Sequence, residues 1–124
     1  MLLKFTIGLP PRTKKNSNRI VKAHGRLMVI PSKEYKDYER DCEKFMPKLD
    51  APIDFPVEVE CKFYFADKRR RDLCNCLEAI CDVLTHYNVV KDDCYTIIES
   101  HDGSRCGVDK EFPRTEVTIR SIEQ

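Results

Sequence analysis

Hydrophobic and polar residues alternate along three stretches of the chain, and this pattern predicts three β-strands that each bury one face. The clearest stretch is Val57–Phe65, in which every second residue is apolar and most of the residues between are charged. The other two are residues 3–7 and 115–122. Shorter strands are expected at residues 27–30 and 95–99, which are apolar or β-branched runs bounded by polar segments.

Two further segments carry apolar residues at the three- and four-residue spacing of amphipathic helices. The first follows Ser32, a residue type that caps helices, and extends to residue 49 with fraying near Pro47. The second begins near Asp72 and ends near residues 86–88. Both helices are expected to pack their apolar sides against a sheet.

Polar stretches at residues 12–26, 50–56 and 101–114 contain glycine or proline and are expected to connect these elements as loops. The order of elements predicts an α+β fold, with a mixed β-sheet and two main helices. A chain of 124 residues is expected to form a single domain, here residues 1–124.

Charge is distributed unevenly along the chain. The net charge is only +1, yet residues 1–33 contain eight lysines and arginines and no acidic residue, so the rest of the chain is acidic overall. The basic loop at residues 12–26 offers donors that suit phosphate contacts, namely Lys14, Lys15, Asn16, Arg19 and Arg26. This asymmetry favours a polyanion such as DNA as the partner, with a solvated basic loop as the alternative.

Several classes of protein are disfavoured by the composition. No run of 18 apolar residues is present, so no membrane partner is expected, and the N-terminus lacks the pattern of a signal peptide. The seven cysteines include no Cys-x-x-Cys pair, and reduced thiols in the cytoplasm are the simplest interpretation. A zinc site built from Cys74, Cys76, Cys81 and Cys94 is disfavoured, because Cys76 and Cys81 fall on the apolar helix face.

Three consecutive arginines precede the second predicted helix: Arg69, Arg70 and Arg71. Asp72 follows them at the expected helix start, where an ordinary aspartate would cap the helix. Guanidinium groups bind phosphate oxygens through paired hydrogen bonds. The arrangement indicates a phosphate-binding surface beside a carboxylate.

Asp92 and Asp93 follow the same helix, where aspartates are also common as turn residues. If the next strand returns beside Val57–Phe65, we expect Asp72 and Asp93 to converge. Crowded carboxylates repel one another unless a cation lies between them, and oxygen ligands favour Mg²⁺ or Mn²⁺. Such an ion activates water and neutralises charge on a phosphodiester. The pattern therefore predicts a metal-dependent nuclease, provided that Asp72 and Asp93 lie close enough to share one ion.

The motif Arg71-Asp72-Leu73-x-Asn75, followed by a helix and Asp92-Asp93, resembles that of the RusA family of phage and bacterial Holliday-junction resolvases. The resemblance extends over nearly the whole chain, including Pro10-Pro11 and Gly25-Arg26. It implies a homodimeric α+β endonuclease that cuts four-way DNA junctions in recombination and repair, using Mg²⁺ or Mn²⁺. It also implies catalytic and metal-binding roles for Asp72 and Asp93, with Asp92 beside them, and a catalytic role for Arg71.

Two positions depart from the family motif. Cys74 stands where the family usually has aspartate, and Glu78 stands where well-studied members have lysine. A thiol is a poor ligand for a hard metal. In the slightly favoured account, Glu78 replaces the missing carboxylate as a metal ligand, and Arg70 or Arg71 stabilises negative charge. In the others, Glu78 is an ordinary exposed residue, or the protein binds branched DNA without cleaving it. An interaction protein that binds no DNA is a third class.

Overall fold

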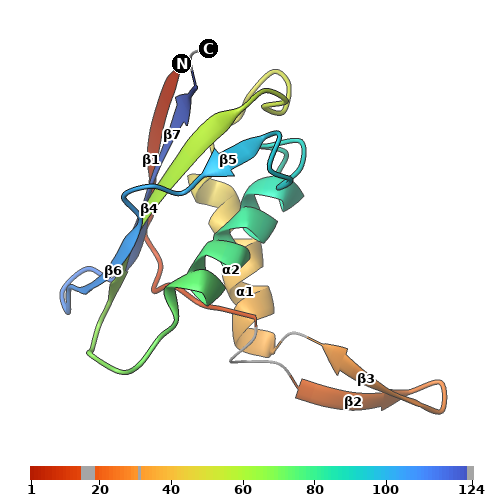
Figure 1. Ribbon diagram of the computed structural model, residues 1–124. Helices are drawn as coiled ribbons and strands as arrows, with labels where there is room; N and C mark the ends of the chain where they lie inside the picture. Colours follow the sequence, from red (N-terminus) through yellow and green to blue (C-terminus); the bar gives the residue numbers. More distant parts are fainter. Residues whose placement is uncertain (15–18, 31, 123–124) are drawn as a thin grey trace.

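The computed structural model describes residues 1–14, 19–30 and 32–122 (Figure 1). The elements in chain order are β1 (Leu2–Ile7), β2 (Arg19–Ala23), β3 (Arg26–Ile30), α1 (Lys33–Asp41), the 3-10 helix η2 (Cys42–Phe45), β4 (Val57–Phe65), α2 (Leu73–His86), β5 (Ile98–Ser100), β6 (Arg105–Val108) and β7 (Arg114–Ser121). Among these described residues, none of the helices has the length and apolar character needed to cross a membrane.

The main sheet is mixed, which confirms the predicted α+β class. Its strand order is β1-β7-β4-β5, and β6 also pairs with β4. The pairs β1·β7 and β7·β4 are antiparallel, whereas β5 and β6 run parallel to β4. Both α-helices lie on the same side of the sheet (Figure 1).

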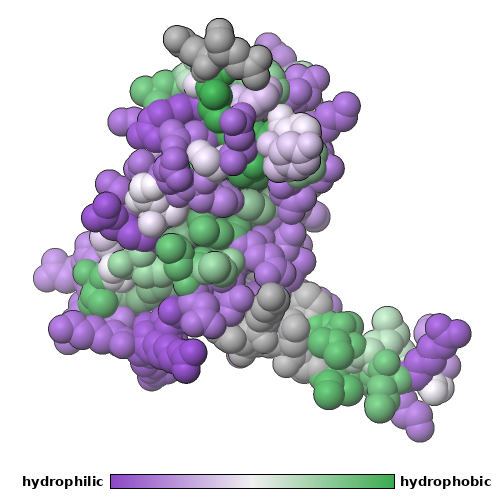
Figure 2. Space-filling model, viewed as in Figure 1, coloured by the Kyte–Doolittle hydropathy of each residue, from purple (hydrophilic) through white to green (hydrophobic). Residues whose placement is uncertain are grey.

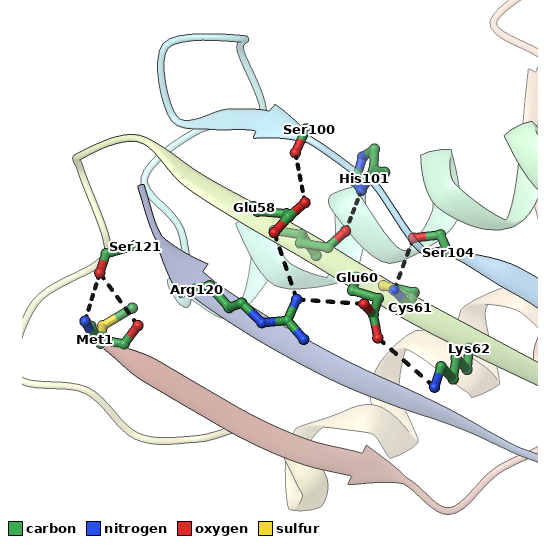
Figure 3. Close-up of polar contacts among 11 residues, drawn as sticks. Met1, Glu58, Glu60, Cys61, Lys62, Ser100, His101, Ser104, Arg120 and Ser121 are labelled. Atoms are coloured by element: carbon green, nitrogen blue, oxygen red, sulfur yellow. Dashed lines mark hydrogen bonds and ion pairs between the residues drawn. The ribbon is translucent and has the colours of Figure 1, made fainter. Parts of the chain in front are cut away.

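The core fills the space between the helices and the sheet. β4 has the bounds that its alternating pattern predicts, and its apolar side chains are all buried. α2 buries Ile80, Val83 and Leu84 on the same side. The opposite face of the sheet is polar: Arg120 on β7 lies 3.6 Å from Glu58 and 3.4 Å from Glu60 on β4 (Figure 3). The buried face thus fixes the orientation of α2.

The segment between β5 and β6 is fastened to the backbone of β4. His101 Nδ1 donates to the Val59 carbonyl at 2.8 Å, and the Cys61 amide donates to Ser104 Oγ at 2.9 Å (Figure 3). Gly103 has a φ of +85°, and a Cβ there would lie 2.6 Å from Glu60 Oε2. Only glycine fits this turn without displacing the Glu60 side chain.

Two segments expected to be loops contain strands. Residues 12–26 include β2, which forms a two-stranded antiparallel sheet with β3. The turn at His24 and Gly25 has positive φ at both residues, as tight hairpins require. Residues 101–114 include β6, which has only four residues and no apolar alternation to reveal it. Pairing with β4, rather than local preference, makes β6 a strand.

Two element boundaries differ from the prediction. Ser32 caps α1 as expected, accepting from the Tyr35 amide at 3.2 Å, but α1 ends at Asp41 and η2 at Phe45. Met46 is extended, with ψ of 135°, because the following Pro47 disfavours a helical conformation there. The strand expected at residues 95–99 begins only at Ile98, after a turn.

Candidate functional site

Asp72 begins α2, but its side chain does not cap the helix. Its carbonyl oxygen accepts from the amides of Asn75 and Cys76 at 3.1 and 3.2 Å. Its carboxylate makes no capping hydrogen bond and is 55% exposed, with Asn75 Nδ2 3.4 Å and Arg70 Nε 3.9 Å away. The ordinary structural role of an aspartate at this position is therefore not used, and the carboxylate faces solvent.

Arg71, in contrast, is engaged within the chain. Its guanidinium lies 4.2 Å from the centre of the Phe65 ring and donates to both the carboxylate and the carbonyl oxygen of Asp67. Its side chain is only 22% exposed. The pKa of Asp67 is lowered, first by the hydrogen bond from the Arg69 amide and then by the one from Arg71. Arg71 thus orders the turn between β4 and α2.

Arg69 and Arg70 remain open to solvent. Arg69 lies 3.6 Å from Asp67, and the side chain of Arg70 is 93% exposed. Ion pairs this exposed contribute little, so both guanidinium groups can turn toward a phosphate. Beside them is a hollow of about 230 Å³, lined by Phe65, Asp67, Lys68, Arg69, Arg71, Cys106, Gly107 and Val108.

The second acidic group lies beyond the other end of α2. Asp92 Oδ1 accepts from the amide of Asp93 at 2.8 Å, and both residues are exposed. The connector before β4 runs alongside, because Ile53 forms a parallel bridge with Val90. Its neighbour Asp54 joins Asp92 in lining a hollow of about 430 Å³. Sequence reasoning missed Asp54, which lies in a proline-containing connector and carries no motif.

Asp72 precedes α2 and Asp93 follows it in the chain. Because β5 is parallel to β4, α2 must cross the sheet from one end to the other between them. A helix of 14 residues is roughly 21 Å long, and Figure 1 shows its two ends on opposite sides of the fold. Among the described residues, no group of three or more histidines, cysteines or acids can hold a metal. That Asp72 and Asp93 act on one ion remains a prediction.

Cys74 and Glu78 are both exposed on the N-terminal half of α2. They lie one helical turn apart, which places them on the same side of the helix. Both follow Asp72 within the first half of the helix. A metal-binding role for Glu78 remains a prediction.

The basic residues predicted to bind DNA in residues 12–26 differ in their surroundings. Lys14 Nζ lies 3.0 Å from Asp82 on α2 and 5.5 Å from the centre of the Tyr35 ring, so an intramolecular carboxylate already faces its charge. Arg26 is exposed at the start of β3, and Arg19 begins β2. Lys15 and Asn16 lie outside the described residues. Contact of this segment with DNA remains a prediction.

A comparison with known families finds a match. The model of the family described as endodeoxyribonuclease RusA matches residues 9–120, nearly the whole chain. A comparison with curated proteins found no matching sequence. The matched region includes the arginine turn, both acidic groups and the basic hairpin. The chain therefore belongs to the RusA family of endodeoxyribonucleases.

Proposed function

We propose that this protein is a metal-dependent endodeoxyribonuclease that resolves four-way DNA junctions, using Mg²⁺ or Mn²⁺, in recombination and repair. Membership of the RusA family implies a junction-resolving nuclease. The proposal treats residues 1–124 as one endonuclease domain. The observation that carries it is the uncapped, exposed carboxylate of Asp72 beside the exposed guanidinium groups of Arg69 and Arg70.

The donor set suits a hard cation. Asp72, Asp92, Asp93 and Glu78 offer carboxylate oxygens, the ligands that Mg²⁺ and Mn²⁺ prefer, whereas the Cys74 thiol does not fit such a site. When bound, the metal would supply an activated water and charge neutralisation. Arg69 and Arg70 would bind and orient the scissile phosphate. Arg71 would act by holding the turn that presents them, since its own guanidinium is engaged with Asp67 and Phe65.

The separation of Asp72 from Asp93 bears on how the site is completed. Asp72 precedes α2 and Asp93 follows it, so two chains could each contribute one of these carboxylates to a shared ion. We therefore propose a homodimer in which Asp72 and Glu78 of one chain face Asp92 and Asp93 of the other. A two-fold axis would then create two equivalent sites. Two sites suit a four-way junction, which is resolved by two cuts.

Cleavage of labelled four-way junctions tests this proposal. The wild type is expected to cut in Mg²⁺ or Mn²⁺, and a chelator is expected to stop it. Asp72→Asn and Asp93→Asn are expected to reduce cleavage by at least about a hundredfold, a size typical of losing a group that stabilises the transition state. Asp102→Asn, an exposed aspartate in the turn after β5, is the matched control and should cut normally. Absence of cleavage by the wild type on varied junction sequences would contradict the proposal.

The second candidate is a protein that binds branched DNA without cutting it, which Cys74 and Glu78 favour. It predicts junction binding that is insensitive to chelators and no difference between wild type and Asp93→Asn. The double variant Cys74→Asp/Glu78→Lys separates the two candidates. If these two substitutions account for lost activity, the double variant gains cleavage on the same scaffold. An unchanged absence of cleavage would show that they do not.

A further inference from the structure

The hairpin formed by β2 and β3, here called the arm (residues 19–30), exposes apolar side chains. Ile20, Leu27 and Val29 are 70%, 78% and 66% exposed. The register pairs Ile20 with Val29 and Lys22 with Leu27, so all three apolar side chains share one face. Figure 1 shows the arm projecting from the body, and Figure 2 shows hydrophobic residues gathered on it.

An arm of this kind needs a partner surface. A two-stranded hairpin is only marginally stable in water unless it packs against something else. Exposed apolar groups clustered within a polar surround mark interaction sites. Here the surround is cationic, because the arm contains Arg19, Lys22 and Arg26 and no acidic residue. The partner surface should therefore be acidic and partly apolar.

The chain itself carries such a surface, here called the acidic end: Asp54, Asp92, Asp93 and Tyr95. The side chain of Tyr95 is 81% exposed, the largest exposure among the large apolar and aromatic residues described. Asp54, Lys91 and Asp92 line the hollow of about 430 Å³ beside it, so carboxylates outnumber the single cation there. Opposite charges and two exposed apolar surfaces make the arm and the acidic end complementary.

One arm cannot serve its own acidic end. The arm leads into the N-terminal end of α1, on the side of the fold where α2 also begins, whereas the acidic end follows the C-terminal end of α2 (Figure 1). The two surfaces therefore lie on opposite sides of one chain. In a two-fold dimer each would meet its counterpart on the other chain, and the contact would be made twice.

We propose that the arm of one copy packs against the acidic end of a second copy. The inference rests on the proposed function in one respect: it supplies the contact that brings Asp93 of one chain to the side of the other chain where Asp72 lies. DNA is the competing occupant. Phosphates would neutralise the cations of the arm but would leave Ile20, Leu27 and Val29 facing a polar backbone.

Oligomeric state, measured by sedimentation without DNA or divalent metal, tests the inference independently of cleavage. The wild type is expected to be a dimer at micromolar concentration. The arm variant Ile20→Ser/Leu27→Ser/Val29→Ser is expected to be a monomer with an unchanged circular dichroism spectrum. Tyr95→Ser is expected to raise the dimer dissociation constant at least about tenfold, as removal of a central aromatic side chain does. Leu2→Ser removes a comparably exposed side chain from β1 and is the matched control, expected to remain dimeric.

Mixing provides a second measurement. A homodimer of either the arm variant or Tyr95→Ser would have both contacts impaired. A mixed dimer would keep one intact contact, between the arm of the Tyr95→Ser chain and the acidic end of the arm-variant chain. Dimers are therefore expected to reappear when the two variants are combined. A monomeric wild type, or an arm variant that stays dimeric, overturns the inference, and an arm variant that stays dimeric but loses DNA affinity assigns the arm to DNA. A dimer that depends on the arm but cuts no junction upholds the inference while the proposed function fails.

Discussion

The guanidinium of Arg71 lies over the ring of Phe65, 4.2 Å from its centre, at the turn that joins β4 to α2. Arg71 also donates to the side chain and carbonyl of Asp67. The arginine run thus divides into one residue that holds the turn and two that face solvent. Phosphate contact and turn stability should therefore respond to different substitutions.

Arg71→Ala is expected to destabilise the fold, because it removes both the ring contact and the hydrogen bonds to Asp67. The ring contact alone is worth about 0.5–1 kcal/mol at a partly exposed site. Arg71→Lys should recover only part of this, since an ammonium cannot reproduce the planar hydrogen-bonding geometry. Urea unfolding followed by circular dichroism measures the free energy of unfolding of both variants. Arg70→Ala is the control and should change the free energy of unfolding by less than about 0.5 kcal/mol; equal losses from Arg70→Ala and Arg71→Ala would contradict this division.

The salt dependence of junction binding should distinguish two cations that the sequence alone treats alike. Arg70 is exposed, whereas Lys14 faces Asp82 at 3.0 Å. Removing one cation that binds a phosphate lowers the slope of log K against log salt by about 0.9 for duplex DNA. Binding is measured in the presence of a chelator, which prevents cleavage. Arg70→Ala is then expected to lower the slope of log K against log salt by this amount, whereas Lys14→Ala is expected to leave the slope nearly unchanged. The opposite order would show that Lys14 leaves Asp82 to bind phosphate.

Much of the fold could be predicted because its buried faces repeat regularly. The alternation in Val57–Phe65 gives β4 with its bounds, and Ser32 marks the start of α1. Within the arm, β3 was predicted at residues 27–30, but β2 was missed because its exposed apolar and charged residues lie on a hairpin that does not border the core. β6 was missed because pairing with β4, and not its own four residues, determines its conformation.

The site was only partly predictable for a related reason. The motif identifies Asp72 and Asp93, but their separation depends on the direction of β5, and alternation within a strand carries no information about direction. A parallel β5 places the two aspartates at opposite ends of α2. Asp54 reaches the acidic end through the bridge between Ile53 and Val90, a contact between segments 37 residues apart that no local pattern reveals.

Stability should fall at alkaline pH because several thiols are buried. Burial raises the pKa of Cys42, Cys76 and Cys81 from 9.0 to about 12. Between these values the folded state keeps protons that the unfolded state releases, so unfolding becomes easier as pH rises. The free energy of unfolding should be unaffected by these groups well below pH 9.0. Above that it should decrease by about 1.4 kcal/mol per pH unit for each thiol.

Denaturant unfolding in a reducing agent, repeated from neutral to alkaline pH, measures this slope. Cys76→Ala should reduce the slope of the free energy of unfolding against pH by the contribution of one thiol. Val83→Ala is the matched control, because it also removes buried volume from α2 but carries no titratable group. It should lower stability at every pH without altering the slope. Equal slopes for the two variants would show that Cys76 does not contribute to alkaline unfolding.

Complementation between two inactive variants is the most direct measurement of a shared site. If Asp72 of one chain works with Asp93 of the other, then Asp72→Asn and Asp93→Asn homodimers each have two defective sites. A mixed dimer has one site in which both substitutions fall together and one in which both aspartates are intact. With random mixing of equal amounts, half of the dimers are mixed, so about a quarter of the wild-type number of sites is restored. Mixing after mild denaturation and refolding allows subunits to exchange.

The double variant Asp72→Asn/Asp93→Asn gives the matched control. Mixed with wild type, it forms mixed dimers in which each site keeps one aspartate, so those dimers should be inactive if the site is shared. If each chain had its own complete site, the wild-type half of every mixed dimer would stay active, and the two single variants would restore nothing when combined. The two mixtures thus give opposite results for a shared site and for a self-contained one.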